Sequence, residues 1–174
     1  MREPLVAWAG DCVVRGSIDV DDGRLSDQVN NLELLTFFDA TLEALDDGRE
    51  VRMDEIEVER RELHLIAVMG RRGDPNRRLR TVEDRVALQV GPYVVTGNLH
   101  RSPSTQPLAA LSSRSRFVPV TDALIEAGDT PSDPLHEDVI LVNRDRISAW
   151  QPLAPIAIQP EAISEARSAS SIQA

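Results

Sequence analysis

The residues best suited to acid, base or metal chemistry are scattered along this sequence. Its three histidines, His64, His100 and His136, stand in separate segments. No two of them have the short spacing with which a helix or a hairpin presents a pair of imidazoles to zinc. We therefore expect no metal site and no cofactor, and we interpret the histidines as packed or solvent-exposed side chains.

Two other features have a partial chemical signature. Residues 19–23 are rich in aspartate, as a calcium loop is, but their glycine comes one position early. Asn30 stands where such a loop needs a bidentate glutamate, so a solvated turn is the better interpretation. The single cysteine, Cys12, cannot form an intramolecular disulfide and follows the pattern of a small core residue.

Two carboxylates and two guanidinium groups recur at matching places. Asp39 recurs as Asp122, and Arg60 recurs as Arg144. Two facing aspartates could act as general acid and general base. An aspartate at a strand end more often bonds to the backbone of a turn. An ion pair between Asp39 and Arg60, repeated by Asp122 and Arg144, would explain these charges without catalysis, so we expect no enzyme and no catalytic residue.

The recurring charges belong to a longer internal repeat with a spacing of 81 to 84 residues. The matching positions begin near Gly16 and Gly97 and continue to Arg60 and Arg144. The spacing grows only where turns are expected, and surface loops accept insertions that strands do not. The alternative is chance similarity between two valine-rich stretches. We predict a duplicated unit, in which the shared glycines, aspartates and arginines are requirements of the fold.

Apolar periodicity predicts strands in both units. Residues 55–59 alternate between apolar and charged side chains, as a half-buried strand does. Residues 32–45 are ambiguous by themselves, but their counterpart, residues 116–125, contains Pro119 and β-branched residues that oppose an interior helix. Each unit then has four or five short strands, which a small and strongly bent barrel buries economically.

The expected fold class is therefore all-β, with two tandem, duplicated small bent-sheet β-barrels related by pseudo-twofold symmetry. We expect a first barrel over residues 1–68, an Arg-rich connector over 69–85 and a second barrel over 86–152. Residues 153–174 are expected to form a docking arm and a disordered tail. Near the end of the connector, Thr81 could cap a short helix.

The charge is distributed unevenly. The 174 residues carry a net charge of -10, and all of the basic residues are arginine. The first 68 residues hold 7 Arg and 17 acidic residues, whereas the connector holds 6 Arg and 3 acidic residues. An acidic body repels nucleic-acid phosphates, so nucleic-acid binding is disfavoured outside the connector. No apolar segment predicts a membrane span or a signal peptide, and we expect a cytoplasmic protein.

The order of features in each unit resembles the Sm-like small β-barrel family over roughly 55 residues. A strand with Gly16, a polar loop with Asp27 and Asn30, a strand with Asp39, and Arg60 before the last strand follow that order. The resemblance implies a five-stranded bent sheet and a base-binding pocket formed by the loop Asp and Asn with an Arg-Gly step. Here the glycine of that step is replaced by Arg61 in the first unit and by Asp145 in the second.

A second resemblance concerns the polar loop alone. Arg24, Ser26, Asp27 and Asn30 follow the order of an Arg-Leu-Ser-Asp motif with a following Asn that occurs in uncharacterised bacterial domains. That class implies no activity.

The expected function is a non-enzymatic scaffold or adaptor that contacts a protein partner, or other copies of itself, through sheet edges. The alternative is RNA or nucleotide binding through the polar loop and the connector. The residues for this alternative are Arg24, Ser26, Asp27, Asn30, Arg71, Arg72, Arg77 and Arg78. The connector arginines lack the aromatic neighbours on which bases stack, which favours a solvated linker or one that lies on the acidic first unit.

Overall fold

The computed structural model describes residues 1–21, 24–68, 80–112, 115–127 and 133–154. The elements of the first half are β1 (Arg2–Trp8), β2 (Cys12–Asp19), α1 (Leu25–Asn31), β3 (Leu34–Ala44), β4 (Glu50–Glu59), the 3-10 helix η1 (Arg60–Glu62) and β5 (Leu65–Val68). Those of the second half are β6 (Val82–Val90), β7 (Tyr93–Arg101), η3 (Ala109–Ser112), β8 (Phe117–Ala127), β9 (Leu135–Asn143), η4 (Arg144–Arg146) and β10 (Ile147–Pro152).

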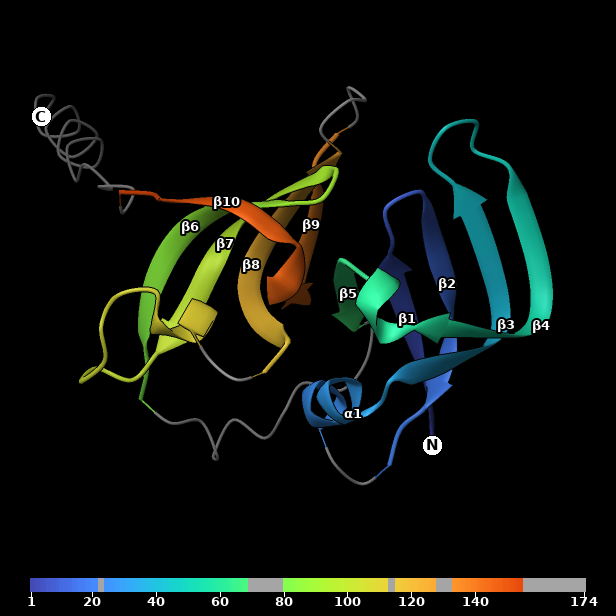
Figure 1. The fold of residues 1–174 in the computed structure, drawn as a ribbon, viewed down its shortest axis with the longest axis horizontal. Helices are drawn as coiled ribbons and strands as arrows, with labels where there is room; N and C mark the ends of the chain where they lie inside the picture. Colours follow the sequence, from blue (N-terminus) through green and yellow to red (C-terminus); the bar gives the residue numbers. More distant parts are fainter. Residues whose placement is uncertain (22–23, 69–79, 113–114, 128–132, 155–174) are drawn as a thin grey trace, which may run out of the picture.

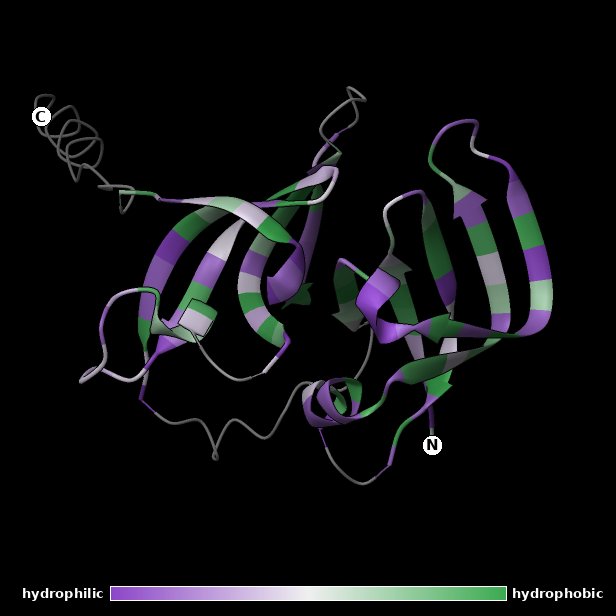
Figure 2. Ribbon diagram, in the orientation of Figure 1, coloured by the Kyte–Doolittle hydropathy of each residue, from purple (hydrophilic) through white to green (hydrophobic). Residues whose placement is uncertain are grey.

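The prediction of an all-β fold is confirmed. Ten antiparallel strands form one sheet in the order β10-β6-β7-β8-β9-β5-β1-β2-β3-β4 (Figure 1). The strand expected over residues 32–45 is present as β3. Apolar and polar residues alternate along many of the strands (Figure 2). The apolar side chains of such a strand therefore lie on the same face of the sheet. No helix in the described residues is long and apolar enough to cross a membrane.

The structure decides two local features: the polar stretch over residues 24–31, whose apolar spacing fits a helical turn or a loop, and the short helix expected after Thr81. The polar stretch after β2 forms the helix α1, in which Leu25 and Val29, four residues apart, are both buried. The prediction of a short helix after Thr81 is wrong, because the strand β6 already begins at Val82, inside the expected connector. Every second residue at the end of β6 is buried, which is the period of a strand and not of a helix.

The two halves follow the same strand order but are joined head to tail. In each half the fifth strand lies beside the first, and the fourth lies at the far side. The halves meet where β9, the fourth strand of the second half, pairs with β5, the fifth strand of the first. A twofold axis would pair like strands with each other. The predicted pseudo-twofold relation is therefore wrong.

The junction between the halves is well bonded. β5 and β9 are antiparallel, with Ile66 opposite Leu141 at the centre of the pairing. Beyond the strand end, the Asn143 backbone N–H donates to the His64 carbonyl at 2.8 Å. The Asn143 side-chain amide, which is 1% exposed, donates to the Leu63 carbonyl at 2.7 Å. These bonds satisfy buried backbone groups of both halves.

Each half has its own core, and each core receives side chains from the other half. Phe117 and Leu141 of the second half pack into the core of the first half with Ile66. Leu65 and Ala67 point the other way, into the core of the second half. This exchange follows from the alternation of side chains along paired strands.

Gly16 and Gly97 occupy the same place in the two halves. Both lie at a shift of register, in β2 against β3 and in β7 against β8. A Cβ at Gly16 would approach the Phe38 carbonyl oxygen to 2.9 Å, and one at Gly97 would approach the Thr121 carbonyl oxygen to 3.0 Å. Only glycine allows these backbones to come so close.

The sheet bends strongly but does not close. Its outermost strands are β4 and β10, and these two do not pair with each other. Figure 1 shows β4 at one side of the molecule and β10 at the other. The duplication, the Sm-like barrels and the division into separate domains stay predictions.

Candidate functional site

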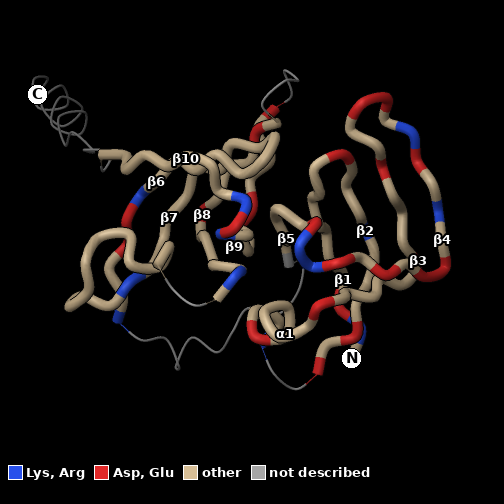
Figure 3. Tube along the Cα trace, in the orientation of Figure 1, with Lys and Arg blue, Asp and Glu red and all other residues tan. Residues whose placement is uncertain are grey.

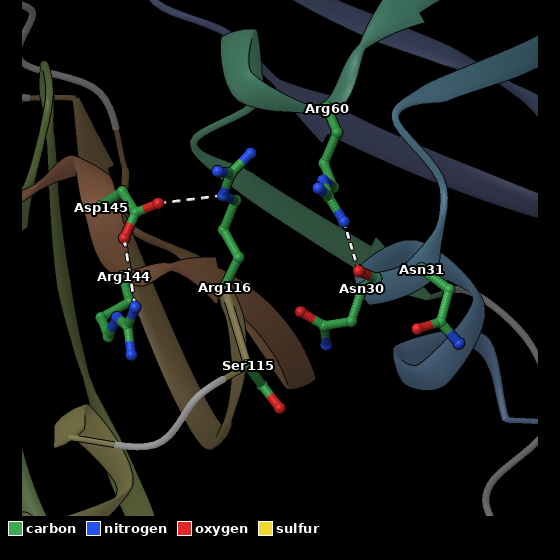
Figure 4. Close-up of a pocket in the computed structure, with 7 residues that line it drawn as sticks. All are labelled: Asn30, Asn31, Arg60, Ser115, Arg116, Arg144 and Asp145. Carbon is green, nitrogen blue, oxygen red and sulfur yellow. Dashed lines mark hydrogen bonds and ion pairs between the residues drawn. The ribbon is translucent and has the colours of Figure 1, made fainter.

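A polar pocket lies where the two halves face each other (Figure 4). Its volume is about 340 Å³. The first half contributes the end of α1 and the start of η1, and the second half contributes η4 and the residues before β8. The lining residues are Asn30, Asn31, Arg60, Ser115, Arg116, Arg144 and Asp145. Three arginines and one aspartate give this lining an excess of positive charge, in contrast to the whole protein.

Asn30 holds the two halves together. Its side-chain amide donates to the Phe117 carbonyl at 3.1 Å, and its Oδ1 accepts from the Phe117 backbone N–H at 2.8 Å. The amide also donates to the Ser26 carbonyl within α1. Because both ends of the amide are occupied, the edge that would read a nucleotide base in an Sm-like pocket is already bonded to β8.

Arg60 is the buried arginine of the pocket. Its side chain is 8% exposed, and its Nη2 lies 2.6 Å from Glu33 Oε1. Its Nη1 donates to the carbonyls of Val29 and Asn30, so the guanidinium binds the end of α1. Arg60 Nε has no hydrogen-bond partner in the described part of the chain. Arg60 therefore fixes the helix, while its Nε is buried and unpaired among the described residues.

The second half supplies a different charge arrangement. Asp145 accepts from Arg116 Nε at 2.9 Å and from Arg144 Nη2 at 3.4 Å (Figure 4). One carboxylate thus partly neutralises two guanidinium groups. Arg116, Asp145, Ser115 and Asn31 were not predicted as site residues. Asn31, at the end of α1, comes to the other three only because β9 pairs with β5.

The expected ion pairs between the repeated charges are wrong. Arg60 pairs with Glu33 and not with Asp39, which is 85% exposed and lies 4.0 Å from Arg2. Asp122 bonds to Arg85 at 2.8 Å and to His136 at 3.0 Å. Asp39 and Asp122 instead share a backbone conformation, with φ of 50° and 49°.

This left-handed conformation explains why the position repeats. Aspartate tolerates it better than most residues, because its short side chain bonds locally.

Hydrogen bonds from His136 and Arg85 lower the pKa of Asp122. A carboxylate held in its charged form is a poor proton donor near neutral pH.

The remaining predicted site residues lie outside the pocket or outside the described residues. Arg24 and Asp27 are exposed on α1 or at its start, and Ser26 is partly buried. None of these three lines the pocket. The connector residues Arg71, Arg72, Arg77 and Arg78 lie outside the described residues. The docking arm and tail lie there too, apart from residues 153 and 154.

The histidines and the cysteine occupy separate environments. His100 lies between two threonine hydroxyls, Thr81 at 3.1 Å and Thr121 at 2.7 Å. Burial, and secondarily the neighbouring Asp11, raise the pKa of Cys12 to about 11, so its thiol is protonated at neutral pH. The described residues contain no group of three His, Cys, Asp or Glu side chains placed to hold a metal ion.

His64 is buried at the junction of the halves, 7% exposed. Its ring packs beside the β6–β7 turn, where a Cβ at Gly91 would come within 2.4 Å of it. Burial first, and then the positive charge of Arg146, lower the pKa of His64 below its usual value. His64 therefore favours its neutral form in the folded protein.

We expect the fold to lose stability as the pH falls below about 6.5, because the unfolded chain then binds a proton at His64 that the folded chain resists. The loss should continue until the pH reaches the lower pKa of the folded state. Urea unfolding between pH 8 and pH 5 measures this dependence. In a His64→Gln variant the slope over this range should be shallower, and equal slopes would contradict the assignment.

No protein-family model matches this chain, and no curated protein or solved structure matches it either. The geometry of the described residues therefore carries the functional argument. It offers two features that could bind a partner: the polar pocket, and the two outermost strands of the sheet.

Proposed function

We propose that the protein is a non-enzymatic, cytoplasmic scaffold or adaptor that binds proteins through the free edges of β4 and β10. The observation that carries this proposal is the β5–β9 junction, where edge pairing already joins the two halves of one chain. An edge strand offers a row of backbone donors and acceptors, and another strand can add to it.

The shared features of the two halves support a duplicated, Sm-like architecture as part of the same proposal. These features are the strand order, the two glycines at the register shifts, and the two aspartates with positive φ. A head-to-tail repeat has one used edge and one free edge in each unit. Here β5 and β9 are the paired edges, and the outer sides of β4 and β10 have no strand partner among the described residues.

The test is photo-crosslinking in living cells with the full chain. A photoreactive residue replaces Glu57 on β4 or Trp150 on β10, and a control chain carries it at Leu135, an exposed apolar position on the interior strand β9. We expect covalent protein adducts from both edge positions and few from the control. If neither edge position forms adducts above the control, the proposed function is wrong.

RNA or nucleotide binding is the second candidate, and the pocket is the observation that favours it. Arg60, Arg116 and Arg144 line it, and the buried Nε of Arg60 lacks a partner among the described residues. Two facts weigh against it: the net charge of -10, and the use of the Asn30 amide by β8. Titration with labelled single-stranded RNA at low salt decides the matter. Binding that weakens steeply with salt and is lost in Arg116→Ala would support it.

A further inference from the structure

We propose that the partner of the free edges is a second copy of this chain, with β10 of one copy pairing with β4 of the next. This inference rests on the proposed function and names its partner. The β5–β9 junction within the chain is the template. In the strand order of the two halves, β4 corresponds to β9 and β10 corresponds to β5, and β9 and β5 are the strands that form the internal junction.

The template fixes the register of the external junction. Within the chain, Leu65 lies opposite Val142 and Ile66 lies opposite Leu141. The 3-10 helices η1 and η4 begin 84 residues apart. With this spacing, the residues of β5 are equivalent to those of β10, and the residues of β4 are equivalent to those of β9. Ala149 of one copy then lies opposite Val58 of the next, and Trp150 lies opposite Glu57.

The backbone of β4 is oriented for this pairing. The Arg60 backbone N–H donates inward to the Glu33 carbonyl at 2.8 Å. Backbone donors alternate in direction along a strand, so the N–H of Val58 faces β3 and that of Glu57 faces away from it. Glu57 therefore presents its N–H and carbonyl at the sheet edge.

The backbone of β10 has the matching orientation. The Leu153 backbone N–H donates inward to the Arg85 carbonyl at 2.8 Å. The same alternation turns the N–H of Gln151 toward β6 and that of Trp150 away from it. Glu57 of one copy and Trp150 of the next can then exchange two backbone hydrogen bonds.

Exposed apolar side chains occupy two of the three corresponding places, and Glu57 occupies the third, which is that of Leu141. At the internal junction, Phe117 and Ile66 are buried in one core cluster. Their counterparts at the free edges are Leu34 and Trp150, which are 46% and 54% exposed. Pairing β10 with β4 brings these two side chains to one junction, where both lose contact with water.

Charge gives the pairing its direction. The C-terminal part of β4 contains Glu55, Glu57 and Glu59, whereas β10 contains no charged residue (Figure 3). Two β4 strands side by side would place like charges opposite each other, which is unfavourable. An uncharged strand avoids that repulsion. Each copy therefore uses β10 once and β4 once, which builds a ring or a filament depending on the rotation between copies.

The experiment combines native mass with two variants that each block one edge. Glu57→Pro removes an outward N–H from β4, a change that an edge strand tolerates. Trp150→Glu places a charge on β10 opposite Glu57 of the next copy. We expect the wild-type chain to sediment as two or more copies. Each variant alone should need a concentration at least about 30-fold higher to associate.

Mixing the variants tests the head-to-tail arrangement. The intact β10 of Glu57→Pro can pair with the intact β4 of Trp150→Glu, so the mixture should form a one-to-one dimer. Leu135→Glu is the control and should assemble like the wild type, because Leu135 is exposed on the interior strand β9. Circular dichroism establishes that all three variants are folded.

Three outcomes would overturn the inference: a monomeric wild type, an assembly that both variants leave intact, and a mixture without a dimer. Its failure is distinguishable from failure of the proposed function. A monomeric chain whose edge positions still crosslink to other proteins keeps the proposed function and loses this partner.

Discussion

Replacing Phe117 with alanine is expected to lower the free energy of unfolding by about 3–5 kcal/mol. Phe117 is 1% exposed, and it starts β8 in the second half but packs in the core of the first. The substitution removes an aromatic side chain from a place that neighbouring strands cannot refill, because β3, β5 and β9 are fixed by their pairing. It therefore weakens both halves together.

Urea unfolding, followed by circular dichroism, measures this effect. The Trp150→Glu background is the appropriate one, since assembly would add to the apparent stability. Leu135→Ala is the control, because Leu135 is 45% exposed and its loss should cost less than about 0.5 kcal/mol. We expect one transition at lower urea for Phe117→Ala. Two separate transitions, with only one shifted, would mean that the halves fold independently.

The strands were predictable because their signals are local. The alternation over residues 55–59 and the proline in residues 116–125 decide between strand and helix without any distant contact. The polar stretch that became α1 has only Leu25 and Val29 to mark it, and this spacing fits a helical turn or a loop equally well. Its helical form depends on burial against β8 and on the bonds from Arg60.

The joining of the halves was not predictable from the repeat. A sequence repeat shows which strands of the two halves are equivalent. It does not show whether the halves pair through two equivalent strands or, as here, through the fifth strand of one and the fourth of the other. That choice depends on the fit of whole edges, which no short window of sequence contains. Asn30 was a predicted site residue, but its bonds to Phe117, 87 positions away, were not predictable for the same reason.

One signal for the ion pairs was present in the sequence. The position before β3 holds Glu33, and its counterpart before β8 holds Arg116. The position after Arg60 holds Arg61, and the one after Arg144 holds Asp145. The charges are inverted between the halves, so each half keeps one acid and one base close together. Equality of Asp39 and Asp122 led to the wrong partners. The inversion indicates the pair Arg116–Asp145 in the second half, whereas in the first half Glu33 pairs with Arg60 and not with Arg61.

Replacing Arg60 with methionine should lower the free energy of unfolding by about 2–4 kcal/mol. Methionine keeps much of the buried volume but cannot donate to the carbonyls of Val29 and Asn30 or pair with Glu33. The end of α1 then loses its donors. The bonds between Asn30 and Phe117 that link the halves should weaken with it.

Arg144→Met is the matched control, since Arg144 holds the corresponding place in the second half. Its side chain is 30% exposed and contacts Asp145, which Arg116 also binds, so we expect a loss below about 1 kcal/mol. Hydrogen exchange of the α1 amides should quicken in Arg60→Met and stay unchanged in Arg144→Met. Arg60→Lys keeps the charge but not the planar fork, and should recover less than half of the loss. Equal losses for the Arg60 and Arg144 variants would show that the anchoring of α1 does not depend on burial of the guanidinium.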